Sequence, residues 1–100
     1  MLWLLDAISR RFISMDIRGE FGRALRAARI ERGLSQEELA FRAGMSVPYL
    51  SNLERGRSSP SLVMMHDLAL ALDLHIAELL APMTMDAERT TGGRRRPREE

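Results

Sequence analysis

Cysteine is absent from this sequence of 100 residues, and so is lysine. A chain without cysteine has no disulfide framework, no thiolate zinc site and no cysteine nucleophile. This composition suits the reducing cytoplasm, where we expect the protein to reside. All 15 basic residues are arginine, and we attribute that bias to GC-rich coding rather than to a requirement of binding.

Long apolar segments are also missing, so nothing in the sequence predicts a membrane span. The sequence has 45% hydrophobic and 29% charged residues, the composition of an ordinary globular protein, and its length is that of one domain with a modest core. Its two histidines, His66 and His75, are far apart, no third metal ligand is spaced to join them, and no nucleophile lies beside a base. We therefore expect neither a cofactor nor an enzyme.

The sequence also lacks a large net charge. The formal net charge is +1, and the stretch from Asp16 to Ala81 carries eight arginines against nine acidic residues. The positive excess therefore lies in the terminal segments. Because nucleic-acid-binding domains are often far more basic, this central part could not bind DNA through bulk charge, and the distribution of its charges must decide.

Apolar residues recur at helical spacing along the chain, with no alternating strand pattern and no internal repeat. We therefore expect an all-α fold of five helices. The first extends from about Gly19 to Arg32, and Gly33 ends it by adopting a left-handed conformation. Ser35 begins the second helix, and Glu38 completes a capping box there.

The turn after the second helix falls at Gly44, where the chain needs a positive φ that glycine adopts without steric cost. Ser46 then caps the third helix. Pro48 lies in its first turn, where a missing amide hydrogen costs little, and Gly56 ends it. Two short helices joined by a tight turn are therefore expected between Ser35 and Gly56.

Two further helices follow the loop that ends at Pro60, one over about residues 61–72 and one over about residues 76–80. Together the five helices define a domain at residues 18–81. Residues 82–100 have almost no apolar side chains and are expected to form a disordered, flexible tail. The RRRPR run in this tail either adds non-specific attraction to phosphate or only keeps the protein in solution.

Residues 1–17 form an N-terminal extension for which two interpretations stay open. Apolar residues recur in it at helical spacing, namely Leu2, Leu5, Ile8 and Phe12, so it could form a helix that packs on the domain or on a partner. Alternatively, translation begins at Met15 and the preceding stretch is a mis-assigned start. We do not expect a signal peptide, because the start carries no basic region and Asp6 interrupts the apolar run.

The segment SQEELAFRAGMSVPYLSNLERG combines two short helices with a glycine turn, the arrangement by which a second helix enters the major groove of DNA. The places where the two helices must pack are filled by apolar residues, namely Leu39, Ala43, Met45, Leu50 and Leu53. From about Glu20 to Leu80 the sequence resembles the Xre/Cro family of lambda-repressor-like DNA-binding domains. The motifs GLSQEELA and YLSNLERG, followed by a Pro-Ser helix start and LALAL, come in the family's order.

This resemblance implies a sequence-specific transcriptional regulator that binds double-stranded DNA. We expect a repressor that binds a palindromic operator as a homodimer, with residues 47–53 in the major groove. The expected dimer interface is the apolar surface of the last two helices, around Leu70, Leu74, Ile76 and Leu79.

The resemblance also assigns contacts with DNA to individual residues. Base edges would be read from the outward side of the third helix, by Val47, Pro48, Ser51 and Asn52. Asn52 is the best reader, because an amide pairs bidentately with adenine, whereas Pro48 has a competing role in shaping the helix start. Phosphates would be contacted by Gln36, at the exposed start of the second helix, and by Tyr49, Arg55 and Arg57. The ring of Tyr49 would help to fill the groove between helices while its hydroxyl reaches a phosphate.

An ion pair between Arg29 and Glu54 is a further implication of the resemblance, and it would orient the third helix from a partly buried position. Three departures from the family pattern accompany these matches. The front of the third helix lacks arginine and glutamine, so specificity could depend on DNA shape. Asp73 replaces a common glycine, and His75 replaces a better helix cap, so we expect a looser last turn.

A role in protein interaction is the main alternative. The chain would then be an antitoxin that binds a toxin protein and represses its own operon through the same DNA-binding module. The partner surface would come from residues 2–13 or from Met83 and Met85, since methionine adapts to varied partners. A helical bundle without any nucleic-acid role is the remaining alternative.

Overall fold

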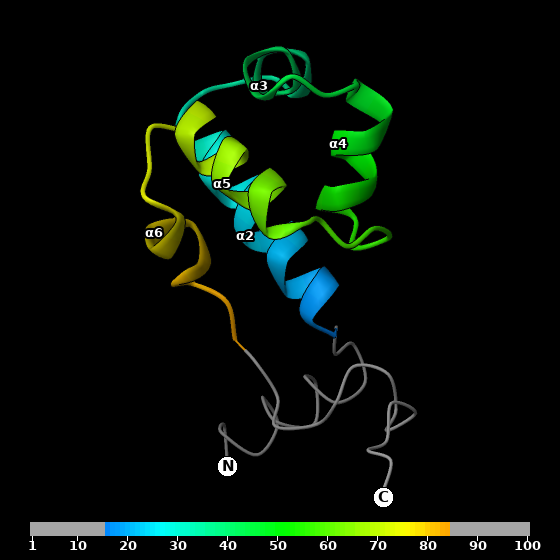
Figure 1. The fold of residues 1–100 in the computed structure, drawn as a ribbon, viewed down its shortest axis with the longest axis vertical. Coiled ribbons are helices and arrows are strands. Elements are labelled where there is room, and N and C mark those ends of the chain that lie inside the picture. Colours follow the sequence, from blue (N-terminus) through cyan, green and yellow to red (C-terminus); the bar gives the residue numbers. More distant parts are fainter. Residues whose placement is uncertain (1–15, 85–100) are drawn as a thin grey trace, which may run out of the picture.

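Five helices joined by short loops make up residues 16–84, the part of the chain that the computed structural model describes (Figure 1). They are α2 (Ile17–Glu31), α3 (Gln36–Ala43), α4 (Val47–Glu54), α5 (Leu62–Ala71) and α6 (Ile76–Leu80). Residues 16–84 contain no strand, so the all-α prediction is confirmed. The predictions for the N-terminal extension before Asp16, for Met85 and for the RRRPR run lie outside the described residues.

Helix α2 begins at Ile17, earlier than the start predicted at Gly19. Asp16 caps this helix, because its Oδ1 accepts hydrogen bonds from the backbone N–H groups of Arg18 at 3.0 Å and Gly19 at 3.4 Å. A carboxylate in this position supplies partners to amides that have none inside the helix. The sequence pattern did not indicate this cap, because the apolar spacing used to place the helix starts only at Phe21.

Serine side chains cap the next three helices. At α3, Ser35 Oγ accepts from the Glu38 N–H at 3.0 Å, and Glu38 Oε1 accepts from the Ser35 N–H at 2.8 Å, so the predicted capping box is confirmed. Ser46 caps α4 through the Tyr49 N–H at 3.2 Å. Each helix of the helix-turn-helix segment thus has a start that is encoded within its own first turn.

Asp73 and His75 lie in the turn before α6, where the sequence predicted a looser structure. His75 caps α6, since its Nδ1 accepts from the Ala77 N–H at 3.0 Å while Glu78 Oε1 accepts from the His75 N–H at 2.8 Å. Asp73 adopts the left-handed conformation, with φ of 59°, that the more common glycine would adopt at lower cost. An imidazole nitrogen thus replaces a serine oxygen as the acceptor of this cap, and the looser turn stays a prediction.

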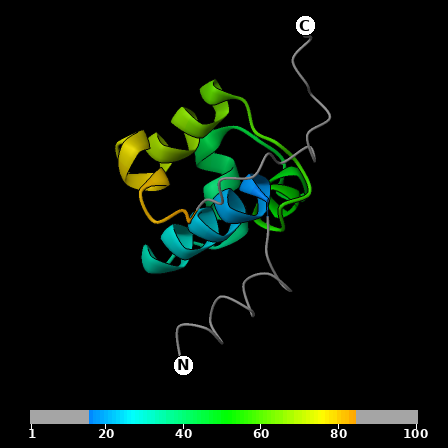
Figure 2. The same ribbon diagram turned by 90° about the horizontal axis from the view of Figure 1, so that it is seen from below.

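The helices form a closed ring in which α2 contacts α4, α4 contacts α3, α3 contacts α5, α5 contacts α6 and α6 returns to α2. Figures 1 and 2 show α4 and α6 on opposite sides of α2, with α3 across one end. The interior of the ring is filled mainly by fully buried leucines, namely Leu25, Leu39, Leu50, Leu53, Leu68, Leu72 and Leu79. None of the described helices has the length and hydrophobicity needed to cross a bilayer.

Burial of Leu79 corrects the predicted dimer interface. Only 1% of this residue is exposed, so it belongs to the core of its own chain and cannot contact a second copy. On a helix as short as α6, the sequence pattern does not distinguish a residue of the core from one of an outer surface. Leu70 is 61% exposed, and Leu74 and Ile76 are partly buried against the core.

Two glycines allow α2 to lie directly against the end of α4. A Cβ atom added at Gly22 would lie 2.4 Å from the carbonyl oxygen of Leu53, and one added at Gly56 would lie 2.7 Å from the Cα of Gly19. Both distances are shorter than any real contact of a Cβ atom. Backbone therefore packs on backbone here, and α2 fixes the position of α4 without intervening side chains.

We predict that Gly22→Ala lowers the free energy of unfolding by about 2 kcal/mol, the cost of forcing extra volume against rigid backbone. Alanine is the better helix former by about 1 kcal/mol, so a loss would mean that the clash outweighs propensity. In Gly33→Ala, the added Cβ meets nothing within 4 Å and only the left-handed conformation is penalised, at about 1 kcal/mol. Urea denaturation measures both, and a more stable Gly22→Ala variant would contradict the close packing.

Candidate nucleic-acid interface

Helices α3 and α4 form a helix-turn-helix whose inner face is apolar. Leu39, Leu50 and Leu53 are fully buried, and Ala43 and Met45 pack partly against the same core. Gly44 makes the turn with φ of 73°, as predicted. Because α4 is anchored on its buried side, the side chains on its other side remain available for contact with another molecule.

The residues expected to read bases differ in their exposure. Ser51 and Asn52 are partly exposed, and Pro48 is exposed in the first turn of α4. The side-chain amide of Asn52 takes part in no hydrogen bond among the described residues, although its backbone oxygen accepts from the Arg57 N–H at 2.9 Å. Asn52 therefore has a side chain that is held on a helix and is free to pair.

Val47 lies closer to the core than the sequence predicted for an outward residue, whereas the ring of Tyr49 was expected to fill space between helices. Both are partly buried and pack against the core cluster. An apolar side chain gains free energy by leaving water, so these two residues contribute to folding as well as to the surface of α4. The correction concerns Val47, which was expected to face outward.

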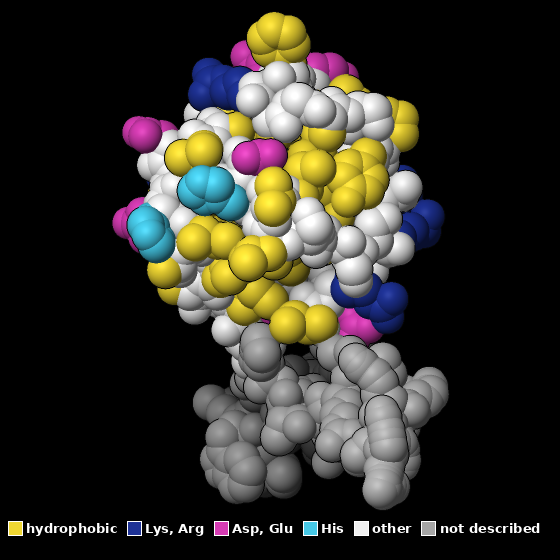
Figure 3. Space-filling view, viewed as in Figure 1, with side chains coloured by type: hydrophobic (Ala, Val, Ile, Leu, Met, Phe, Trp, Pro, Cys, Tyr) yellow, Lys and Arg dark blue, Asp and Glu magenta, His cyan; other side chains and the backbone are white. Residues whose placement is uncertain are grey.

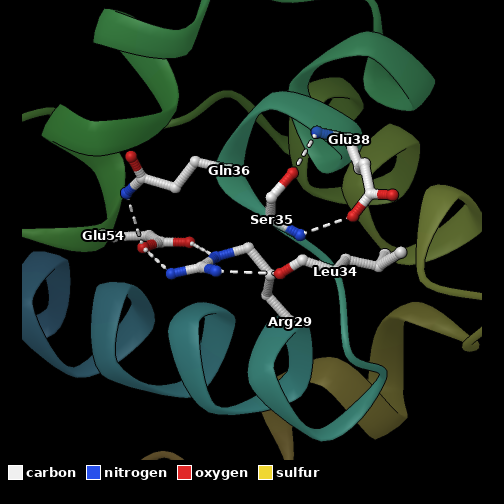
Figure 4. Close-up of polar contacts among 6 residues, drawn as sticks. All are labelled: Arg29, Leu34, Ser35, Gln36, Glu38 and Glu54. Atoms are coloured by element: carbon white, nitrogen blue, oxygen red, sulfur yellow. Dashed lines mark hydrogen bonds and ion pairs between the residues drawn. The ribbon is translucent and has the colours of Figure 1, made fainter.

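A buried carboxylate, that of Glu54, connects α4 to the rest of the domain (Figure 4). The Glu54 side chain is only 2% exposed, and it accepts from Arg29 Nε at 2.6 Å and from Arg29 Nη2 at 3.0 Å. Arg29 Nη1 also donates to the Leu34 carbonyl at 2.9 Å. One guanidinium thus joins α2, the loop before α3 and the end of α4, and the ion pair expected between Arg29 and Glu54 is present.

Gln36 takes part in this network as well, a role that the sequence did not predict. Its Nε2 donates to Glu54 Oε1 at 3.0 Å, and the residue is partly buried rather than exposed. Gln36 and Glu54 are 18 positions apart, so no local pattern indicates this bond. Among the described residues no buried side-chain nitrogen or oxygen lacks a hydrogen-bond partner. The hydrogen bond to Glu54 also raises the pKa of Arg29 above its ordinary value.

Arg55 and Arg57 follow α4 in a tight loop. Gly56 adopts φ of 74°, and the Arg57 N–H returns to the Asn52 carbonyl. Both arginines are exposed, and within residues 16–84 neither forms an ion pair or a side-chain hydrogen bond. The loop therefore presents two uncompensated positive charges directly after α4. Within the same residues no cluster of three possible metal ligands occurs.

We predict that Glu54→Ala lowers the free energy of unfolding by about 3 kcal/mol, because it leaves the Arg29 guanidinium partly buried without its carboxylate. The double variant Arg29→Met, Glu54→Leu should lose much less, since it removes both charges and keeps apolar volume. Urea denaturation of the three proteins tests this. Equal stability of Glu54→Ala and the parent chain would show that the network does not hold α4.

Comparison with known proteins identifies relatives of this arrangement. Residues 25–79 match the family HTH_3, described as helix-turn-helix. The HTH-type transcriptional regulator y4dJ of Sinorhizobium fredii is 44% identical over 68 residues, which are 68% of this chain and 88% of that protein. The immunity repressor protein of Bacillus phage phi105 is 36% identical over 67 residues, 67% of this chain but only 46% of the repressor.

A solved structure agrees with these sequence relatives. The restriction-modification controller protein C.AhdI from Aeromonas hydrophila superposes with a TM-score of 0.60 at 46% sequence identity. The match covers 61% of this chain and 92% of the controller protein. At this identity the likeness extends beyond the fold to the sequence.

Proposed function

Because the chain belongs to the HTH_3 family of Xre/Cro-like helix-turn-helix proteins, and is a DNA-binding transcriptional regulator rather than an enzyme, we propose that it is a repressor. In this proposal it binds a palindromic operator as a homodimer, with α4 in the major groove. It acts in the cytoplasm, on the DNA of the nucleoid. The observation that carries the proposal concerns α4. This helix is anchored on its inner side by buried leucines, and on its other side it carries Ser51 and the side-chain amide of Asn52, which has no hydrogen-bond partner among the described residues.

Contacts with bases come from α4 in this proposal. Asn52 pairs with the N6 and N7 atoms of adenine, and Ser51 donates to or accepts from a base edge. Pro48 makes only apolar contact, for example with a thymine methyl group. Since Val47 is partly buried, it contributes at most the edge of its side chain, and Asn52 becomes the main source of sequence preference.

Contacts with phosphates position the protein and carry no sequence information. Arg55 and Arg57 supply charge directly after α4, and the Tyr49 hydroxyl supplies a donor within it. The side-chain amide of Gln36 donates one hydrogen to Glu54, and its second hydrogen is left for a phosphate oxygen. Gln36 also lies at the positive N-terminal end of α3, which favours an anion. Gln36 thereby links a phosphate contact to the network that holds α4.

The direction of regulation is inferred from relatives. One relative is an immunity repressor protein of a phage, and another is a controller protein of a restriction-modification system. The first name states repression and the second states control. For this chain we propose repression, because a dimer bound across an operator blocks access to the DNA without any further domain.

The antitoxin alternative gains no support from the described residues. Met83, one of the two methionines proposed to contact a toxin, packs partly against the core of its own chain and lines a groove with Phe21 and Leu80. Met85 and residues 2–13 lie outside the described part of the chain. We therefore do not propose a toxin partner.

Dimerisation is proposed to occur through α5 and α6. Figure 3 shows apolar side chains gathered over these two helices, while arginines reach only the edges of this face. On α5, Leu70 is 61% exposed, and Leu74 and Ile76 lie partly buried beside the core. An exposed apolar surface of this kind is stabilised when a second copy covers it.

We predict that the chain is a dimer at tens of micromolar and that Leu70→Asp makes it monomeric, because a carboxylate cannot be buried unpaired in an apolar interface. Phe41→Asp is the matched control, since Phe41 is an apolar residue of α3 that is 87% exposed outside the proposed interface. Sedimentation equilibrium distinguishes them. A monomeric parent chain, or equal effects of both variants, would contradict the proposed interface.

Selection of bound duplexes from a random DNA pool tests the operator and its reader together. We predict two half-sites about 34 Å apart, one helical turn of DNA, each with one adenine whose preference disappears in Asn52→Ala. The affinity for the selected site should fall by about 1–3 kcal/mol, with unchanged affinity for unrelated DNA. Thr84→Ala is the control at an exposed position. Unchanged selection by Asn52→Ala would remove this residue as the reader.

A further inference from the structure

The described residues include eight arginines, and their partners divide them into two groups. Four are held by other groups of the chain. Arg18 pairs with Asp16, Arg23 with Glu20 at 2.8 Å, Arg29 with Glu54 at 2.6 Å, and Arg32 donates to the Leu72 carbonyl at 2.5 Å. The other four have no ion pair or side-chain hydrogen bond within residues 16–84, namely Arg26, Arg42, Arg55 and Arg57.

Three of these four unpaired arginines line one open groove. Arg26 reaches it from α2, and Arg55 and Arg57 reach it from the loop that follows α4. All three are exposed. We call this feature the arginine groove and define it by Arg26, Arg55 and Arg57. Like charges held close together repel one another and destabilise the folded chain, so their gathering at one site needs an explanation.

The acidic residues at the arginine groove are not free to neutralise it. Asp16 caps α2 and pairs with Arg18. Glu54 is buried and already accepts hydrogen bonds from Arg29 and Gln36. The groove therefore keeps a net positive charge, although the domain around it carries slightly more acidic than basic residues.

Close backbone packing holds the two sides of the arginine groove together. The Cα of Gly19 lies so near Gly56 that a Cβ atom there would be 2.7 Å away. The first turns of α2 and the loop after α4 are thus in direct contact. Because α2 is a continuous helix from Ile17 to Glu31, Arg26 is held at a fixed position relative to Arg55 and Arg57.

We propose that the arginine groove binds a phosphodiester group of the DNA backbone, and that Arg26 is therefore a DNA-contacting residue of α2. Guanidinium groups recognise phosphate oxygens through paired hydrogen bonds, and three of them around one groove match an anion with two exposed oxygens. This inference rests on the proposed function and extends the interface from the helix-turn-helix to α2. It also explains how a domain without excess positive charge attracts DNA.

Fluorescence anisotropy with the full chain tests the inference, using the selected operator and an unrelated duplex over a series of salt concentrations. Arg26→Ala should weaken binding to both duplexes by about three- to tenfold, because a phosphate contact carries no sequence information. The slope of log K against log salt should become shallower by about 1. Unfolding should be unchanged, since Arg26 is exposed and alanine favours helix. Arg42→Ala, the remaining unpaired arginine, should leave the slope as it is.

The outcomes separate this inference from the proposed function. If Arg26→Ala keeps the parental slope while Arg55→Ala and Arg57→Ala reduce it, α2 does not contact DNA and the inference fails, whereas the regulator proposal stands. If the parent chain binds no duplex, the proposed function fails. Inorganic phosphate should compete only weakly, because a free anion lacks the other contacts that the duplex makes. Binding of inorganic phosphate as tight as that of the duplex, and lost in Arg26→Ala, would mean that the groove is a site for free phosphate and would overturn its assignment to DNA.

Discussion

A single buried carboxylate fixes the geometry on which the interface depends. Glu54 ends α4, is almost inaccessible to water, and is held by Arg29 of α2 and Gln36 of α3. Removing a carboxylate from water is costly, and only a complete set of charged and polar donors offsets that cost. The three helices must therefore meet in one arrangement, and α4 is presented in a defined orientation rather than only packed by leucines.

Backbone contact between α2 and the end of α4 complements this network. Gly22 and Gly56 have no side chain at the points where the two segments touch, so the same helix that supplies Arg29 also brings Arg26 next to Arg55 and Arg57. In this account, affinity for DNA depends on the arginines gathered in the arginine groove, since the domain has no overall excess of positive charge. Helix α2 contributes residues to the hydrophobic core, to the ionic network around Glu54 and to the arginine groove.

Local signals in the sequence predicted what local interactions determine. The capping box at Ser35, the turn at Gly44 and the anchoring of α4 by Leu50 and Leu53 follow from residues near one another in the chain. Family resemblance added the pair between Arg29 and Glu54. What the sequence missed depends on tertiary packing: the bond from Gln36 to Glu54, the burial of Leu79 and the gathering of three arginines join residues that are distant in the chain.

The central claim is that DNA meets the protein along α4 and the adjoining face of α2. Chemical-shift mapping of the ¹⁵N-labelled chain, titrated with its selected duplex, tests this most directly. The account predicts that the largest shifts fall on residues 47–57, on the first turn of α3 and on the part of α2 around Arg26. Shifts centred instead on α5 and α6, with α4 unaffected, would contradict it.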